Sequence, residues 1–314
     1  MGMRKEKIME ITKAAIIGFG AIGCVYGRRL YNLMGDNFAV VAGGQRAERL
    51  RKNGETINGE KITPVVVEPY NKDWKADLII FSVKNYQLEG AIDDVKNLVG
   101  PNTVILTIMN GVSAREKISE AYPNNTVLYG LSKADAERTP EGVNCTWEGV
   151  IQFGEADNTV MSEKVKAVKE LFDRALIPNE VCEDMLRAVW IKFMRNVGMN
   201  QLSAITGAPY GGFINIPELT KALREVMEEV MAIAQKKGID ITEKDIDESV
   251  EVISGSDPLG KTSMLQDIEA KRKSEVDSFS KVVIEEGKKV GVPTPWNDRI
   301  YLLIKTKEKL YGVE

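Results

Sequence analysis

A glycine motif near the N-terminus limits the fold more than any other part of the chain. It has the pattern G-x-G-x-x-G and lies between a short apolar segment at 13–17 and a helical segment at 21 to about 34. In this strand–turn–helix setting the glycines allow a tight turn, close approach of a pyrophosphate and close packing of helix on strand. We therefore predict dinucleotide binding at the positive end of the helix, although a glycine-rich turn that binds nothing is the alternative. The motif residues are Gly18, Phe19, Gly20, Ala21, Ile22 and Gly23.

Strand-like and helix-like segments alternate through the first half of the chain. Apolar runs rich in β-branched residues are typical of strands buried on both faces of a parallel sheet. Strand-like segments lie at 38–42, 77–83, 103–109, 126–130, 144–147 and 150–153. A short helix is expected at 46–52, and Asn58-Gly59 predicts a two-residue hairpin turn. The alternation predicts an α/β domain with a Rossmann-like, doubly wound sheet.

Beyond about residue 181 the pattern becomes helical. Apolar residues recur at intervals of three and four, and Gly or Pro separates the segments. This pattern predicts an all-α C-terminal domain. We expect a dinucleotide-binding domain at 1–182, a helical domain for substrate and catalysis at 183–314, and an active site in the cleft between them.

The 314 residues include no histidine. This excludes Ser-His-Asp and Cys-His nucleophiles, zinc sites that need an imidazole, and dehydrogenases whose proton donor is a histidine. Acid–base chemistry must therefore use Lys, Asp, Glu, Tyr or Cys, and we expect no metal site.

The net charge indicates which kinds of molecule the protein can bind, and the cysteines indicate its cellular compartment. Lys and Arg number 42 and Asp and Glu 46, so the formal net charge is −4. A mildly acidic chain is a poor candidate for binding nucleic acid or an anionic membrane, and no stretch approaches the ~20 apolar residues that span a bilayer. Three widely spaced cysteines, Cys24, Cys145 and Cys182, predict free thiols in a reducing compartment. We therefore expect a cytoplasmic protein that acts on a small molecule.

The end of the second predicted strand bears on the choice of cofactor. NAD sites usually place Asp or Glu there to bind the ribose. Here the strand runs into Gly43-Gly44-Gln45-Arg46. A guanidinium suits a 2′-phosphate, so the sequence favours NADP over NAD. The alternative is that Arg46 is an ordinary solvated side chain.

Polar residues also follow two other predicted strands. Lys84 and Gln87 come after the strand at 77–83, and Asn110 comes after the strand at 103–109. Ligands of open α/β sheets bind at the carboxyl ends of strands, which makes these residues candidates. For Lys84 alone, the simpler interpretation is the first solvated residue after a buried strand.

A polar stripe crosses the most apolar segment of the second half. Lys192, Asn196 and Asn200 recur at intervals of four, with ~40° of rotation per step on a helix. Burial of a lysine and two amides costs free energy unless they are paired. We interpret the stripe as ligand contacts, and the alternative is that it satisfies loop backbone or contacts between domains.

Five segments in this order resemble the ketopantoate reductase (2-dehydropantoate 2-reductase) family, and the resemblance covers nearly the whole chain. They are GFGAIG, SVKNYQ, MNG, WIKFMRNVGMN and TSMLQDIEAKRKSEVD. The resemblance implies NADPH-dependent reduction of a 2-keto acid, 2-dehydropantoate, to (R)-pantoate in pantothenate and coenzyme A synthesis. It makes Lys192 the general acid, with Glu275 also catalytic. Implied substrate contacts are Asn110, Asn196, Asn200, Ser263 and Glu275. Implied cofactor contacts are residues 18–23, Lys84, Gln87, Asn110 and Ala136, to which the residue pattern after the second strand adds Arg46.

The chain departs from the family pattern at several positions. Gly43 or Gly44 stands where the family often has an arginine, which bears on the strictness of NADP over NAD. Tyr210 and Gly260 stand where some members have substrate-facing asparagines, which leaves another 2-keto acid open as the substrate. A non-catalytic NADP-binding sensor is a further alternative. The sequence does not fix the oligomeric state, and a homodimer is among the open alternatives.

The spacing between Ser263 and Glu275 adds a geometric condition. A continuous helix would place them ~18 Å apart, too far for both to contact one small substrate. Ser274-Glu-Val-Asp277 has the form of a capping-box variant. We therefore predict a helix break, with a new helix that carries Glu275 in its first turn.

Overall fold

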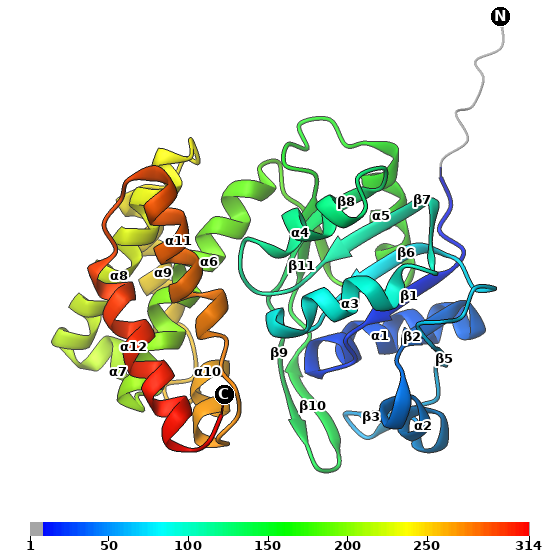
Figure 1. The fold of residues 1–314 in the computed structure, drawn as a ribbon, viewed down its shortest axis with the longest axis horizontal. Coiled ribbons are helices and arrows are strands. Elements are labelled where there is room, and N and C mark those ends of the chain that lie inside the picture. Colours follow the sequence, from blue (N-terminus) through cyan, green and yellow to red (C-terminus); the bar gives the residue numbers. More distant parts are fainter. Residues whose placement is uncertain (1–8, 314) are drawn as a thin grey trace, which may run out of the picture. The chain divides into compact units, whose positions relative to one another are not determined.

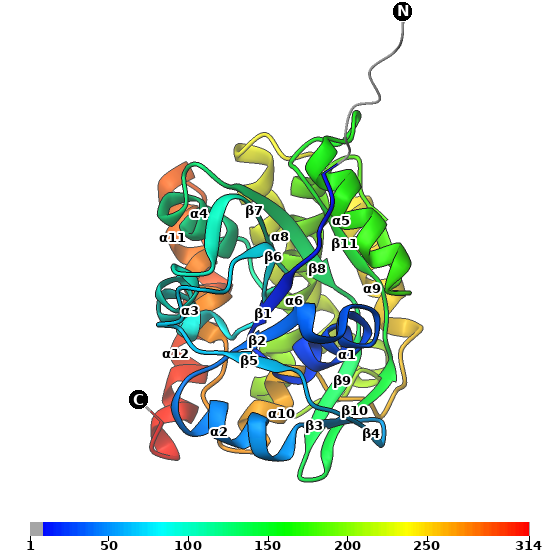
Figure 2. The ribbon, with the colours of Figure 1, turned by 90° about the vertical axis from the view of Figure 1, so that its right-hand side faces the viewer.

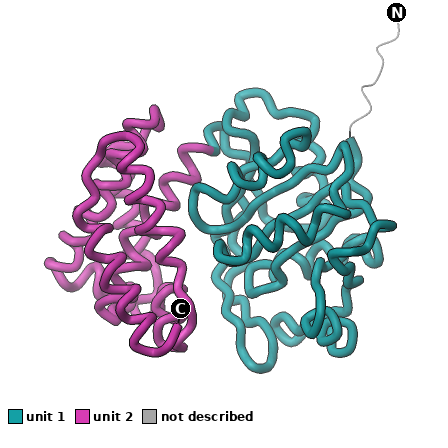
Figure 3. The backbone as a smooth tube through the Cα atoms, in the orientation of Figure 1, with its two compact units in different colours: residues 1–185 teal, residues 186–314 magenta. Residues whose placement is uncertain are grey.

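The computed structural model describes residues 9–313, which divide into two compact units at Met185 and Leu186 (Figure 3). The first unit ends at residue 185 and contains both sheets. The second begins at residue 186 and is helical. No helix within the described part of the chain is both long and apolar enough to cross a membrane.

An eight-stranded sheet forms the centre of the first unit (Figure 1). Its order is β12-β11-β8-β7-β6-β1-β2-β5, and neighbouring strands are parallel except for β8 and β11. The strands are β1 (Ala14–Ile17), β2 (Phe38–Val41), β5 (Val65–Val67), β6 (Ala76–Phe81), β7 (Val99–Thr107), β8 (Thr126–Ser132), β11 (Ile151–Gly154) and β12 (Asn179–Val181). The predicted doubly wound α/β sheet is confirmed.

Helices cover both faces of this sheet (Figure 2). Alternate residues of one strand enter different cores: Ile16 packs with residues of α1 and α5, whereas Ile17 packs with residues of α3 and α4. The strands are therefore buried on both sides, as their continuous apolar runs predict. The helices are α1 (Ala21–Met34), α2 (Gly44–Asn53), α3 (Leu88–Val95), α4 (Ala114–Ala121) and α5 (Glu163–Arg174), with single 3-10 turns η1 (Gly35–Asn37) and η2 (Asn85–Gln87).

A separate four-stranded sheet has the order β4-β3-β10-β9. The predicted hairpin is present, because β3 (Glu55–Ile57) and β4 (Glu60–Ile62) join through Asn58 and Gly59, both at positive φ (49° and 80°). Strand β10 (Gly142–Trp147) pairs with β3, and β9 (Asp135–Thr139) pairs with β10. Neither β9 nor this second sheet was expected from the sequence pattern.

The second unit consists of helices, as predicted. They are α6 (Met185–Thr206), α7 (Gly212–Asn215), α8 (Pro217–Lys236), α9 (Glu243–Ser254), α10 (Ser263–Glu269), α11 (Ser280–Val290) and α12 (Pro295–Leu310), with one 3-10 turn, η3 (Val276–Ser278). The core includes fully buried side chains from α6, α8 and α12, among them Met194, Val226 and Ile304. The helix α6 thus lies in the core and can hold a polar side chain firmly.

Candidate active site

The glycine motif forms the turn between β1 and α1 in the first unit. Gly18 has φ +94°, and a Cβ there would lie 2.4 Å from the carbonyl carbon of Ser82. A Cβ on Gly23 would lie 2.0 Å from the oxygen of Gly18, so this glycine allows the helix to pack on the turn. At Gly20, in contrast, an added Cβ meets no described atom within 4 Å. The open space over this residue is what a closely approaching phosphate needs.

The amino end of α1 is open to a ligand. Gly20 is its N-cap, and no side chain among the described residues caps this end. The first backbone N–H groups of the helix thus lack side-chain acceptors, which a phosphate oxygen can supply. Together with the space at Gly20, this fits the pyrophosphate of a dinucleotide.

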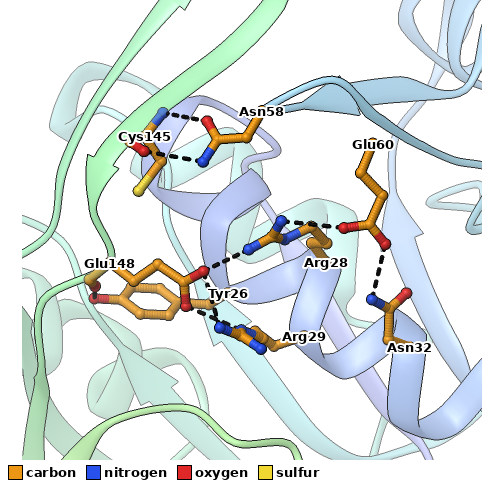
Figure 4. A network of polar contacts seen from close by, with 8 residues as sticks. All are labelled: Tyr26, Arg28, Arg29, Asn32, Asn58, Glu60, Cys145 and Glu148. Atoms are coloured by element: carbon orange, nitrogen blue, oxygen red, sulfur yellow. Dashed lines mark hydrogen bonds and ion pairs between the residues drawn. The ribbon is translucent and has the colours of Figure 1, made fainter.

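Charged contacts anchor α1 to the neighbouring sheet (Figure 4). Arg28 forms ion pairs with both Glu60 and Glu148, and Arg29 binds Glu148 through two hydrogen bonds of 2.9 and 3.1 Å. Asn58 exchanges two hydrogen bonds with the backbone of Cys145, at 2.7 and 2.9 Å. The ion pairs tie the helix to β4 and to the residue directly after β10, and the Asn58 bonds tie the hairpin to β10.

The polar residues after β6 and β7 lie at the same edge of the sheet as the glycine turn, because β1, β6 and β7 are parallel neighbours. The Asn85 amide donates to the Asn110 carbonyl oxygen over 2.8 Å and so links the two strand ends. Gln87 accepts from the Lys84 backbone N–H at 3.3 Å. The structure thus brings Lys84, Gln87 and Asn110 to the edge where the sequence places the cofactor.

Arg46 stands in the first turn of α2, after β2, where its side chain is exposed. Partial desolvation lowers its pKa, and the charges of Arg138 and Arg49 lower it further. These two arginines share the buried carboxylate of Glu55, at 3.1 and 3.4 Å. Two guanidinium groups therefore pair with one carboxylate, and the charge of Arg46 lies close enough to interact with all three groups, an excess of positive charge that favours an anion.

Arg138 was not expected near the glycine turn, because it lies on strand β9, which the sequence pattern did not predict. Its guanidinium donates to the Phe19 carbonyl oxygen within the glycine turn, over 3.0 Å. No local pattern marks this residue, since the contact joins positions 119 residues apart. Ala136 lies on the same strand, where it is half-buried and packs against the core on the α1 face.

In the second unit, α6 carries the polar stripe. Asn200 is 5% exposed, whereas Lys192 and Asn196 are half-buried. Apolar neighbours on the same helix, such as Trp190 and Phe193, are buried. The stripe therefore interrupts an otherwise apolar helix, as the sequence predicts.

Gln201, next to Asn200, is fully buried and links α6 to α11. Its side-chain oxygen accepts from the backbone N–H (3.0 Å) and hydroxyl (2.7 Å) of Ser280. Asn297 lies 3.4 Å from the Gln201 amide and donates to Glu229 over 2.8 Å. Burial raises the pKa of Glu229, while hydrogen bonds from Asn297 and the Trp296 backbone lower it. This network joins α6, α8, α11 and α12 and fixes the rotation of the stripe.

The helix break between Ser263 and Glu275 is confirmed. Helix α10 ends at Glu269, and Glu275 is a buried residue directly before η3. Ser263 is exposed at the first position of α10. The ~18 Å separation of a continuous helix therefore does not apply.

The predicted capping box at Ser274 is wrong, and so is a helix that carries Glu275 in its first turn. The next helix, α11, begins only at Ser280. The Ser274 backbone N–H and hydroxyl both donate to the buried carboxylate of Glu308, at 2.8 and 2.7 Å. Asp277 instead accepts from the Tyr301 hydroxyl at 3.0 Å. The Ser274 hydroxyl oxygen also accepts from the Val276 backbone N–H at 3.3 Å, so both local bonds and contacts to α12 hold the segment before η3.

Comparison with known proteins is consistent across both units. Residues 14–158 match the family model for ketopantoate reductase PanE/ApbA, and residues 184–308 match the model for its C-terminal part. A 2-dehydropantoate 2-reductase from Pyrococcus horikoshii is 29% identical over 96% of this chain and 99% of its own length.

Two solved structures share the fold over the whole chain. A D-mandelate dehydrogenase, with NADH and anilino(oxo)acetate, is 24% identical with a TM-score of 0.86 and covers 96% of this chain and 100% of its own. A dimeric ketopantoate reductase from Staphylococcus aureus is 20% identical with a TM-score of 0.78 and the same coverage.

Proposed function

The chain belongs to the ketopantoate reductase family of oxidoreductases, which use a nicotinamide cofactor, and from this premise we propose that it reduces 2-dehydropantoate to (R)-pantoate with NADPH. This reaction would place it in pantothenate and coenzyme A synthesis. The observation that carries the proposal is the half-buried lysine and amide stripe on α6 of a family member that has no histidine.

The residues of the first unit would bind the cofactor. The backbone at residues 18–23 would hold the pyrophosphate, and Arg46 and Arg138 would bind the 2′-phosphate of NADP. Lys84, Gln87, Asn110 and Ala136 would line the remainder of the cofactor site. When bound, the nicotinamide supplies the hydride that reduces the keto carbon.

The residues of the second unit would act on the substrate. As the keto carbon is reduced, negative charge develops on the keto oxygen, and Lys192 donates a proton to it. Asn196, Asn200 and Ser263 offer neutral donors and acceptors to the remaining polar groups. Asn110 would add a contact from the first unit. Glu275 would bind a substrate hydroxyl and, through its charge, assist Lys192.

Loss of NADPH absorbance against a panel of 2-keto acids, repeated with NADH, tests this function. We expect 2-dehydropantoate to give the highest kcat/KM, and NADPH to be preferred. No turnover of 2-dehydropantoate would reject the proposed substrate, and equal use of NADH would reject the cofactor preference.

Reduction of a different 2-keto acid is the second candidate function. It is favoured by Tyr210 and Gly260, which stand where some family members have substrate-facing asparagines; the Tyr210 ring fills the space that a side chain at 260 would need, since a Cβ there would lie 2.9 Å from the ring. The same panel of acids distinguishes this candidate.

We also propose that the protein is a homodimer. An apolar groove of about 870 Å³ in the second unit is lined by residues of α6, α8 and α12, and Leu259 and Leu303 at its rim are 81% and 53% exposed. Exposed apolar surface of this kind is typical of an interaction site. The mass in solution tests the proposal, and a monomer at micromolar concentration would reject it.

A further inference from the structure

Arg195 is a half-buried cation on the helix that carries Lys192. It follows Lys192 by three residues, a spacing that places the two Cβ atoms ~5–6 Å apart on the helix surface. The rotation places Arg195 ~60° from Lys192, on the flank opposite to Asn196. The side chains at 192 and 195 can therefore reach adjacent groups of one small ligand.

No described residue pairs with this guanidinium. Arg195 forms no hydrogen bond or ion pair within residues 9–313, and Tyr210 interacts with it electrostatically. Burial lowers the pKa of Arg195, and Tyr210 raises it. In the same unit Arg187 donates to Asp245 over 2.5 Å, and Arg272 pairs with Asp267 at 2.9 Å. A half-buried arginine without an anion costs free energy that an anionic ligand would recover.

Tyr210 and Gly260 shape the surroundings of this cation. The Tyr210 backbone N–H donates to the Gly260 carbonyl oxygen over 3.0 Å. A Cβ on Gly260 would lie 2.9 and 3.0 Å from two carbons of the Tyr210 ring, so glycine at 260 leaves room for the ring. The tyrosine is thereby fixed within electrostatic reach of Arg195. Ser263 follows Gly260 by three residues.

We propose that Arg195 binds the carboxylate of the 2-keto acid substrate. The inference rests on the proposed function, because it takes Lys192 as the proton donor to the keto oxygen. In a 2-keto acid the carboxylate is bonded directly to the keto carbon. A lysine and an arginine three residues apart can therefore bind the two groups together, and a guanidinium matches both carboxylate oxygens. Arg195 stays protonated throughout and positions the substrate.

The test compares an acid with its neutral counterpart. The lactone of 2-dehydropantoate keeps the keto group and lacks the carboxylate. Wild type, Arg195→Gln and Arg195→Lys are assayed with NADPH on both compounds. Arg187→Gln is the matched control, because it removes an arginine of the same helix that has protein partners.

We expect Arg195→Gln to lower kcat/KM for the acid by about 10- to 100-fold, mainly through KM, as loss of a hydrogen bond to a charged group predicts. The kcat/KM for the lactone should change by no more than about twofold. Arg195→Lys should recover part of the lost kcat/KM for the acid. Arg187→Gln should change kcat/KM for the acid and for the lactone by the same factor. Equal losses for acid and lactone in Arg195→Gln would overturn the inference and leave the proposed function intact.

Binding without turnover separates the two proposals. The Kd of 2-dehydropantoate is measured without NADPH for wild type and Arg195→Gln. Wild type could reduce no 2-keto acid and still bind 2-dehydropantoate about tenfold or more tightly than Arg195→Gln. That result would support the carboxylate site and reject the proposed function. If wild type neither reduces nor binds the acid, both fall.

Discussion

Replacement of Gly20 by alanine separates cofactor binding from folding. The backbone at Gly20 has φ −82°, which alanine adopts without strain, and an added Cβ meets no described atom within 4 Å. The substitution should therefore stabilise the folded state slightly, by ~0.4–1 kcal/mol. The thermal midpoint should rise by no more than about 4 °C.

The same methyl group occupies the space that the pyrophosphate requires. Displacement of the phosphates from the α1 amides removes one or two charge-assisted hydrogen bonds, each worth ~1.5–3 kcal/mol. The Kd for NADPH should rise by about 10- to 100-fold or more. Fluorescence titration of NADPH gives the Kd, and differential scanning fluorimetry gives the midpoint.

Gly90→Ala is the matched control. Gly90 lies in α3, outside the glycine turn and outside the proposed cofactor contacts, and a Cβ there also meets no described atom within 4 Å. The substitution Gly90→Ala should leave the Kd for NADPH unchanged. If Gly20→Ala binds NADPH as tightly as Gly90→Ala, the turn does not hold the pyrophosphate and the reasoning is refuted.

Two further predictions concern the first unit. Arg46→Gln should raise the Kd for NADPH by about tenfold and leave the Kd for NADH nearly unchanged. The control Arg51→Gln, which removes a partner of Glu68, should change neither Kd. If Arg46→Gln weakened the binding of both cofactors equally, this would contradict a 2′-phosphate contact. Burial raises the pKa of Cys24 to about 12 and that of Cys182 to about 11. Iodoacetamide at neutral pH should therefore modify the native protein slowly and the unfolded protein rapidly, as mass spectrometry can follow; rapid modification of native Cys182 would contradict this.

Features that depend on neighbouring residues could be predicted from sequence. The glycine turn, the Asn58-Gly59 hairpin and the stripe on α6 follow from backbone conformation and periodicity within one segment. The break between Ser263 and Glu275 also followed, because a single helix could not bring both residues to one substrate.

Features that depend on distant contacts could not be predicted. The cap expected at Ser274 does not form: Ser274 donates to Glu308, 34 residues away, and its hydroxyl oxygen accepts from the Val276 backbone N–H. Strand β9 has mostly exposed, charged residues and gains its structure from pairing with β10. The approach of Arg138 to the glycine turn follows from that pairing, which no local pattern reveals.

The role of Lys192 is the central claim, and Lys192→Ala tests it most directly. The variant should reduce 2-dehydropantoate at least about 100-fold more slowly, as expected for loss of a general acid. Its Kd for NADPH should stay within about twofold of wild type, because the proposed cofactor contacts lie in the first unit. Turnover comparable to wild type would contradict the account, since the chain has no histidine to take over the proton transfer.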